Sequence, residues 1–379
     1  MNTSESLDQL LGLVARHSDL EHIKKVDDRY RRALNYEALS QPPLVVQAAY
    51  GKILELPAPW NTFQRYSYRE TFEDPAAMLQ NMLLDRVVPG LLLKDDSPLA
   101  IRNNHGTIQV ASVLGGQWML HENNFPWVAP FISREKLVAL AQDASEINLQ
   151  AGVLPPSFRT LKFYREKLAQ FPPCDRAIQI SLPDLQGPID TAEQLWGSDI
   201  FLAFEDDHEL FGQLCSRIVN GMIAMAKQYR ALATDRLDPF ANTQHGYMIP
   251  GRLLIRNDTA IMLSPETYAN FVRPHDARLL KEIGTGSIHF CGNGRHLISK
   301  MLEIPDLRGL DFGQPEMMDM AAIYTACRER KVVLTHIRPS REDLISAKAK
   351  QCFPAGVVFV YEARDFNDAR EVARAYYSN

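Results

Sequence analysis

The second half of the chain alternates between short apolar runs and longer segments with helical periodicity. Each apolar run is bounded by polar or turn-forming residues, which is typical of strands buried in a parallel sheet. From this pattern we predict strands at Ala177–Leu182, Arg252–Asn257, Ser287–Cys291, Gly309–Phe312, Val332–His336 and Gly356–Val360.

The segments between these runs carry signals for the start of helices. Ser264 precedes Pro265, which predicts an N-cap and a proline at the first position of a helix that runs to about Ile283. Asp74 and Pro75 give the same signal earlier in the chain. Helices are also expected over residues 319–330 and 341–350, from Thr191 onward, and over most of the chain before about Asn35.

Two further runs, Pro43–Val46 and Leu99–Asn103, complete a series of eight strands that alternate with helices. This alternation predicts an α/β fold, a closed (β/α)8 TIM barrel over residues 41–379, preceded by a helical extension over residues 1–40. An open, doubly wound sheet with a helical domain is the alternative. The sequence contains no glycine-rich dinucleotide or P-loop motif, which favours the barrel.

Charge and cysteine usage exclude some classes of function. The net charge is -5 and basic residues are not gathered in one stretch, so a nucleic-acid partner is not expected. No apolar run has the length of a membrane span. The 5 cysteines are widely scattered, which predicts free thiols and a cytoplasmic protein.

Polar side chains gather where the predicted strands end, and active sites of parallel barrels lie at the carboxyl ends of their strands. Asn103, His105, Gln186, Gln314 and Tyr361 are therefore candidates for binding a small-molecule substrate. For His105, which precedes Gly106, a simple turn is an equally good interpretation.

His289 and Cys291 form the sharpest local pattern, because residues two apart on a strand point to the same face. Zinc accepts both imidazole and thiolate, and a catalytic zinc site uses three protein ligands and leaves one position open. Glu362 follows the apolar last strand and is the candidate third ligand. The alternative for Glu362 is an ion pair with Arg364 at the rim.

Asp184, Asp258 and His336 are the candidate catalytic residues. Asp258 precedes a predicted helix, so an N-cap is its competing interpretation. Asp190 or Thr191 can cap the next helix, which would leave Asp184 free for a ligand. His336 could act as an acid or base, or simply be a satisfied histidine at the barrel mouth.

Five segments after about Pro98 carry a family resemblance: GTIQVASVLGG, PDLQGPIDTAEQLWG, NDTAIMLSPETYANFVRPH, SIHFCGNGRHLI and GVVFVYEARDFNDAREVARAYY. Together they resemble the uroporphyrinogen decarboxylase superfamily, which includes zinc-dependent methylcobalamin:thiol methyltransferases of the coenzyme M type. The resemblance extends to the C-terminus, and it implies a (β/α)8 barrel.

Decarboxylases of this superfamily carry an arginine-bearing segment after the first strand that engages the substrate carboxylates. The corresponding residues here, Gln47 to Gly51 (QAAYG), include no arginine. A polycarboxylate substrate would lose its bidentate contacts to those guanidinium groups. Turnover of uroporphyrinogen is therefore not expected.

In the methyltransferase branch, an HxC pair and a cysteine after the last strand bind zinc. His289 and Cys291 match the pair, and Glu362 stands where that later cysteine is expected. The resemblance then implies zinc held by these three residues, a thiol activated as thiolate and a corrinoid carried by a partner protein. Asp184, Asp258 and His336 would support the site or move protons.

Three hypotheses for function follow. The first is a zinc-dependent methyltransferase that acts between a corrinoid and a thiol. The second is a cofactor-free decarboxylase of uroporphyrinogen or another carboxylated substrate, using Asp184, Asp258 and His336. The third is a non-catalytic barrel that serves as a binding subunit. The sequence leaves open whether the chain forms a homodimer.

Overall fold

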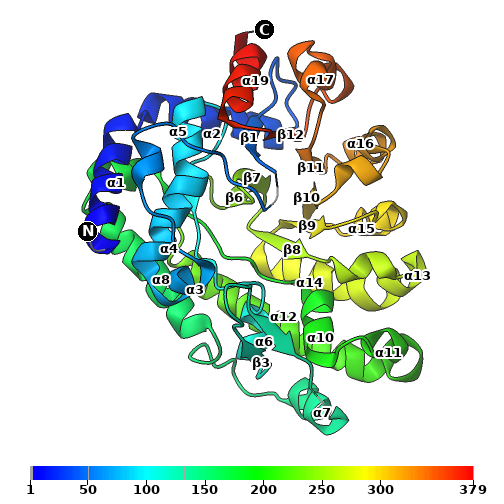
Figure 1. Ribbon diagram of the computed structural model, residues 1–379. Helices are drawn as coiled ribbons and strands as arrows, with labels where there is room; N and C mark the ends of the chain where they lie inside the picture. The colour runs from blue at the N-terminus through cyan, green and yellow to red at the C-terminus, as the bar shows by residue number, and fades with distance from the viewer. Residues whose placement is uncertain (1–2, 50, 132, 379) are drawn as a thin grey trace.

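The computed structural model describes residues 3–49, 51–131 and 133–378, so Tyr50 of the QAAYG segment lies outside the described residues. Its largest sheet contains the strands β1 (Leu44–Ala48), β8 (Leu253–Arg256), β9 (Gly286–Phe290), β10 (Leu307–Phe312), β11 (Val333–Ile337) and β12 (Val357–Ala363). All neighbours in this sheet are parallel, in the order β1-β12-β11-β10-β9-β8 (Figure 1).

The two remaining predicted strands, β2 (Ala100–Ile101) and β5 (Gln179–Ile180), form a separate parallel pair. A single bridge between Gln186 and Arg256 joins the segment after β5 to β8. All eight predicted strands are thus observed. Strand pairing among the described residues gives an α/β fold with a six-stranded parallel sheet, and it does not by itself close a ring of eight.

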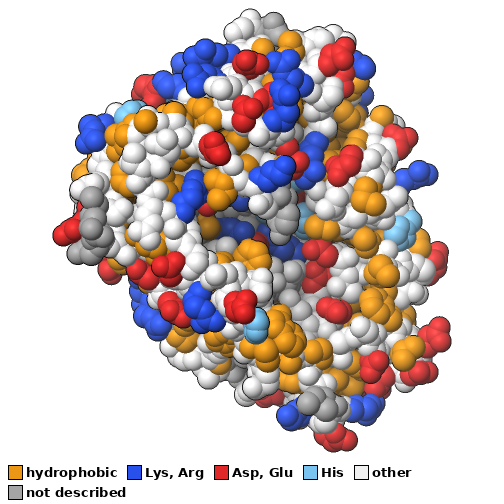
Figure 2. Space-filling model, viewed as in Figure 1, with side chains coloured by type: hydrophobic (Ala, Val, Ile, Leu, Met, Phe, Trp, Pro, Cys, Tyr) orange, Lys and Arg blue, Asp and Glu red, His pale blue; other side chains and the backbone are white. Residues whose placement is uncertain are grey.

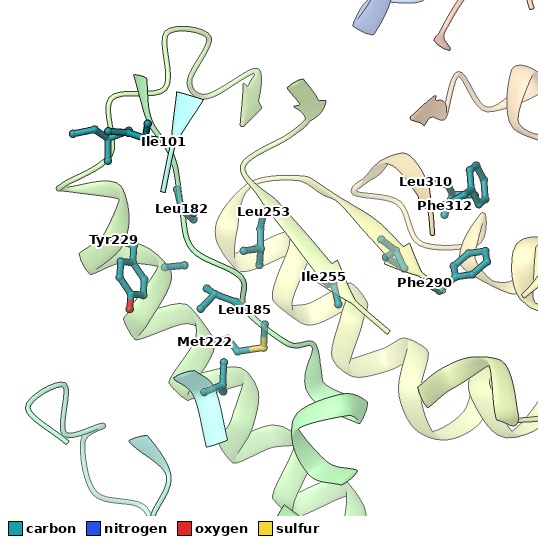
Figure 3. Packing of buried hydrophobic residues seen from close by; sticks show 14 of the residues in the cluster. Ile101, Leu182, Leu185, Met222, Tyr229, Leu253, Ile255, Phe290, Leu310 and Phe312 are labelled. Atoms are coloured by element: carbon teal, nitrogen blue, oxygen red, sulfur yellow. The ribbon is translucent and has the colours of Figure 1, made fainter. Parts of the chain in front are cut away.

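Alternate residues of each strand point to opposite faces of the sheet. On the outer face, Ile255, Phe290 and Phe312 belong to the large core that packs beneath the helices (Figure 3). On the inner face, Leu254, Val333 and Val358 belong to a second, smaller core. Because both faces of the strands are covered, apolar residues occupy positions on both faces.

An antiparallel hairpin that the sequence analysis missed fills the inner face. It consists of β6 (Ala241–Gln244) and β7 (Tyr247–Pro250), and Tyr247 and Ile249 are fully buried in the smaller core. Tyr30 of α2 (Leu20–Leu34) packs in the same core. Figure 1 shows the hairpin inside the curve of the sheet, where β7 contacts β9 and β10.

The helices lie before, between and after these strands along the chain. They are α1 (Thr3–His17), α2, α3 (Tyr68–Glu73), α4 (Pro75–Met82), α5 (Val88–Leu93), α6 (Gln109–Val113), α7 (Arg134–Gln142), α8 (Leu154–Ala169), α9 (Pro172–Ala177), α10 (Pro188–Trp196), α11 (Ile200–Asp206), α12 (His208–Arg230), α13 (Pro265–Thr267), α14 (Arg273–Ile283), α15 (Ile298–Met301), α16 (Met320–Glu329), α17 (Arg341–Ile345), α18 (Lys348–Cys352) and α19 (Phe366–Ser378). A small hairpin, β3 (Gln117–Met119) and β4 (Trp127–Ala129), lies between α6 and α7.

The predicted caps are confirmed in two places. The side chain of Ser264 accepts a hydrogen bond from the N–H of Thr267, and that of Asp74 accepts one from Ala76. The helix expected over residues 341–350 is instead two short helices, because Ala347 between them adopts a left-handed conformation with φ 63°.

One helical stretch, Pro75–Leu93, is long and apolar enough to cross a membrane, but 61% of its most apolar window is buried inside the protein. Such burial is typical of a core helix in a soluble protein. The division of the chain at residue 40 and the cytoplasmic location remain predictions.

Candidate metal centre and its surroundings

The register of the sheet places four polar residues in one row. Arg256 of β8 is opposite His289 of β9, His289 is opposite Asp311 of β10, and Asp311 is opposite Thr335 of β11. In each strand these residues alternate with the outer apolar residues, so their side chains share the inner face. The row therefore lies toward the carboxyl ends of the strands, on the face that the β6–β7 hairpin covers.

Asp311 organises this row. Its fully buried carboxylate accepts hydrogen bonds from Nδ1 of His289 at 2.6 Å, from the hydroxyl of Thr335 at 2.6 Å and from that of Tyr247 at 2.8 Å. His245 contributes a fourth contact at 3.1 Å. Burial opposes the charged form, but the hydrogen bonds from the two histidines outweigh it and hold the pKa of Asp311 well below its ordinary value.

His289 is consequently fixed in one orientation. Burial lowers the pKa of its imidazole, although Asp311 acts in the opposite direction, so the ring is neutral with Nδ1 as the donor. Nε2 is then left as an acceptor. A carboxylate behind the other ring nitrogen is the usual arrangement for a histidine that binds a metal.

Nε2 of His289 faces two further potential donors. Sγ of Cys291 lies 3.5 Å from it and Oδ1 of Asp258 lies 3.8 Å from it. The same Asp258 oxygen accepts the backbone N–H of Cys291 at 2.6 Å. Donors about 2.0–2.3 Å from a tetrahedral zinc ion are roughly 3.3–3.8 Å apart. Both distances from Nε2 match that spacing, and the three ligand atoms lie within 4.8 Å of one another.

The thiol of Cys291 keeps its proton unless a cation lies beside it. Burial and the nearby charge of Asp258 raise the pKa of its thiol to about 12. A thiol in this position is a poor ligand until a positive charge is brought beside it, and metal binding then displaces the proton. A second group of potential ligand atoms, from His245, His289 and Asp311, overlaps the first, but its members already bind one another.

Glu362 lies apart from the group formed by Asp258, His289 and Cys291. Its Oε1 is 3.1 Å from Nη2 of Arg338, and it belongs to neither group of clustered ligand atoms found among the described residues. Arg338 also donates to Nε2 of His336 at 3.1 Å and to the carbonyl of Gly313 at 2.8 Å. The suggested pairing of Glu362 with Arg364 is replaced by this contact, because Arg364 binds Asp368 instead.

His336 is buried and has φ 64°. Burial lowers the pKa of its imidazole to about 3, with Asp311 opposing and Arg338 reinforcing the shift. The ring is therefore neutral and accepts the hydrogen bond from Arg338. This geometry makes His336 a hydrogen-bonding group at the site and a weak base.

Asp184 is paired with two arginine side chains. It forms ion pairs with Arg102 at 2.5 Å and with Arg256. The expected cap of the following helix is not formed either, since Gly187 precedes its first residue, Pro188. Asp190 instead accepts the backbone N–H groups of Asp258 and Thr259, which fixes the loop that carries Asp258. Asp258 itself makes no side-chain cap.

The candidate substrate-binding residues fall into three groups. Gln314 accepts the N–H of Gly292 and so supports the turn after Cys291, and Gln186 lies at the bridge to Arg256. Asn103 is buried against Ser157, with a hydrogen bond of 2.8 Å to its hydroxyl.

The third group consists of two residues that are held by other parts of the structure. His105 is buried against Phe72, with ring centroids 4.9 Å apart, and burial lowers its pKa to about 4. Tyr361 alternates with Glu362 on β12 and binds Asp368 of α19 at 3.0 Å.

Sequence reasoning missed the residues that orient the site. Asp311 is a carboxylate inside the apolar run LRGLDF, and that signal could have identified it. His245 is in the turn of the inner hairpin, with φ 54°, and nothing near it in sequence indicates its position beside Asp311. Arg102 and Arg256 lie inside predicted strands, and the sequence analysis assigned them no role.

Comparison with known proteins identifies the fold. No family model matches the chain, and none of the curated proteins matches it. Among solved structures, a methyltransferase from Methanosarcina mazei has a TM-score of 0.66 and 15% sequence identity, over 93% of this chain and 98% of that chain. The chain thus has a methyltransferase-like fold over nearly its whole length, and at this identity the likeness concerns the fold alone.

Proposed function

We propose that the protein is a zinc-dependent methyltransferase that moves a methyl group between a corrinoid and a small thiol. The observation that carries the proposal is the group formed by Asp258, His289 and Cys291, with Asp311 behind the histidine. The fold shared with a methyltransferase supports the same class of reaction.

The donor set fits zinc better than magnesium or calcium, which prefer oxygen ligands. One imidazole nitrogen, one thiolate and one carboxylate would hold the ion and leave a fourth position open. Zinc in that position would hold a substrate thiol as a thiolate at neutral pH. In this proposal Asp258 takes the place that the family resemblance gave to Glu362.

The protein's own groups have separate tasks. Asp311 fixes the ring of His289, while Thr335 and Tyr247 fix Asp311. Asp258 holds the backbone of Cys291 through the 2.6 Å hydrogen bond, so the sulfur faces the histidine. Because every one of these groups is bound before a ligand arrives, little reorganisation is needed on binding.

The decarboxylase alternative has less support from the geometry. It relied on Asp184, Asp258 and His336 as acids or bases, yet Asp184 is held by two arginines and His336 by Arg338. A carboxylate in two ion pairs is a weak proton acceptor. We therefore place this alternative second.

Three further points belong to the proposal. The β2–β5 pair and the large sheet together form one eight-stranded barrel, joined at the Gln186–Arg256 bridge. The corrinoid is carried by a partner protein that docks at the carboxyl ends of the strands. The reaction takes place in the cytoplasm.

Metal analysis tests the proposal. Protein expressed with zinc available and then dialysed should retain about one zinc per chain, and Cys291→Ala should abolish this stoichiometry. Cys352→Ala is the matched control, because Cys352 is an exposed free cysteine outside the site. The zinc-loaded protein should then demethylate free methylcobalamin in the presence of a thiol, as followed by its absorbance spectrum.

Two results would contradict the proposal. Zinc content that is unchanged in Cys291→Ala would remove Cys291 from any metal site. If the protein binds one zinc per chain but demethylates methylcobalamin with none of a panel of small thiols, it is a metal-binding protein of another class.

A further inference from the structure

The turn after β10 lies directly against the sulfur of Cys291. Figure 2, drawn in the same view as Figure 1, shows a hollow near the centre of this face, beside the strands β8 to β10. Gly313 is the first residue after β10, and a Cβ at this position would lie 2.6 Å from Sγ of Cys291, 3.0 Å from its Cα and 3.2 Å from its Cβ. Gly313 does not adopt a positive φ, so the contact with the cysteine, and not the backbone conformation, requires glycine here.

Hydrogen bonds on both sides prevent Gly313 from moving aside freely. Its N–H donates to the carbonyl of Phe290 at 2.9 Å, and its own carbonyl accepts from Arg338 at 2.8 Å. The side chain of the next residue, Gln314, accepts the N–H of Gly292. The turn is thus bound to the residues before and after the cysteine, and it keeps a fixed position relative to β9.

The backbone of Cys291 is equally constrained, because its N–H donates to Asp258 at 2.6 Å. Its sulfur can turn only about the Cα–Cβ bond, and a change of rotamer moves it by about 3 Å. A side chain at position 313 would therefore displace the sulfur from its place 3.5 Å from Nε2 of His289. Metal ligands tolerate displacements of only a few tenths of an ångström.

We propose that Gly313 is a positioning residue, which holds the sulfur of Cys291 beside His289 by leaving the space that the sulfur occupies. Gly313 has no ligand atom of its own and acts through the cysteine alone. The role of this sulfur as a metal ligand rests on the proposed function. The contact between the glycine and the sulfur does not.

Absorption spectroscopy of the full chain with cobalt in place of zinc tests the proposal. Cobalt accepts similar ligands and, unlike zinc, gives a charge-transfer band when a thiolate is bound. Wild type should show this band at one cobalt per chain. Gly313→Ala should lose most of the band at saturating cobalt and should bind zinc about 10–100-fold more weakly, the usual effect of removing a group that orients a ligand.

Gly309→Ala is the matched control. Gly309 belongs to β10 and is equally crowded, since a Cβ there would lie 2.6 Å from Oγ of Ser287 and 2.7 Å from Cγ of Pro250. Neither neighbour belongs to the candidate metal centre, so this variant should melt at a lower temperature and keep the charge-transfer band. An undiminished band in Gly313→Ala would overturn the proposal. Loss of the band in Gly309→Ala as well would overturn it too, because general destabilisation would then be the cause.

A double-mutant cycle on the metal-free protein separates this proposal from the proposed function. Gly313→Ala should lower the melting temperature of wild type by several degrees, and by clearly less in Cys291→Ala, where the atom at 2.6 Å is removed. If Gly313→Ala folds only in combination with Cys291→Ala, the contact is confirmed in the same way. Equal shifts in the two backgrounds would disprove the contact, whatever the metal content.

The two tests can fail separately. Wild type that binds neither cobalt nor zinc would reject the proposed function, and the cycle would still decide whether Gly313 holds the sulfur. Wild type with a full charge-transfer band and no coupling in the cycle would support the metal centre and reject the role of Gly313.

Discussion

The two sides of the inner cavity are built differently. From β8 to β11 the parallel pairing places Arg256, His289, Asp311 and Thr335 in one row, and register shifts occur only at the start of β10 and between β11 and β12. On the other side, β2 and β5 pair over two residues each. Their neighbours are held through side chains, as where Asp95 and Asp96 accept the backbone N–H groups of Val46 and Leu44.

The difference corresponds to a division of chemical roles. The regular side supplies the candidate metal ligands, whose mutual distances must be fixed within a few tenths of an ångström. The irregular side supplies Arg86 and Arg102, which reach a recess beside the inner hairpin through longer and more adaptable side chains.

The largest effect should come from removing the carboxylate that organises the regular side. Asp311→Ala leaves two histidines and two hydroxyl groups without their acceptor, and should lower the free energy of unfolding by about 3–5 kcal/mol. Chemical denaturation measures this directly. Thr335→Val, which removes a single donor, should cost only about 1 kcal/mol. Equal losses in the two variants would show that Asp311 does not have this central role.

The next largest effect should come from disturbing the junction between the two sides, where Gly187 lies against Arg256. Gly187 has no side chain, and a Cβ there would lie 2.5 Å from the carbonyl oxygen of Arg256 and 2.4 Å from Oδ1 of Asn257. Gly187→Ala should separate the segment after β5 from β8, at a cost of about 2–3 kcal/mol. Gly212→Ala is the control, because a Cβ at Gly212 meets nothing within 4 Å. An unchanged melting temperature in Gly187→Ala would contradict the tight junction.

Zinc affinity distinguishes the two candidate third ligands. Asp258→Asn should weaken zinc binding about 10–100-fold, whereas Glu362→Gln should change it by less than about threefold, because Glu362 is engaged by Arg338. Competition with a chelator of known affinity gives both values. If Glu362→Gln weakens binding more than Asp258→Asn does, or if Glu362→Cys tightens it, Glu362 is the ligand that the family resemblance implied.

The smallest predicted effect is a pH dependence of the free energy of unfolding, which arises from His105 on the irregular side. Burial lowers the pKa of His105 to about 4, below the ordinary value of 6.5, so the folded state keeps this ring neutral. Its contribution to stability is present above about pH 6.5 and is lost as the pH falls toward 4. From about pH 7 to about pH 5.5 the loss should be roughly 1 kcal/mol.

In His105→Gln, this part of the pH dependence should disappear from denaturation curves measured at the two pH values. His121→Gln is the control, because His121 is an exposed histidine of the same region. An identical pH dependence in wild type and His105→Gln would mean that His105 is not buried in its neutral form.

Much of the regular side could be predicted from the sequence. The strand ending in His289 and Cys291 was located correctly, because β9 is a short apolar run bounded by turn residues. The inner hairpin was missed because Ala241–Gln244 (ANTQ) has no apolar pattern of its own, and its polar side chains are buried only by the surrounding strands. Arg338 was not expected to bind both Glu362 and His336, since that contact depends on the distance between two strand ends.

The sequence by itself determined the order of the eight parallel strands and the pairing of His289 with Cys291 on one face, because both follow from local periodicity. The tertiary structure decided which carboxylate lies beside them and that Asp311 orients the histidine. It also decided that Arg86 and Arg102, from distant segments, line one recess beside the inner hairpin. These contacts depend on strand register and on the packing of the inner hairpin, and neither is encoded in any single segment of the chain.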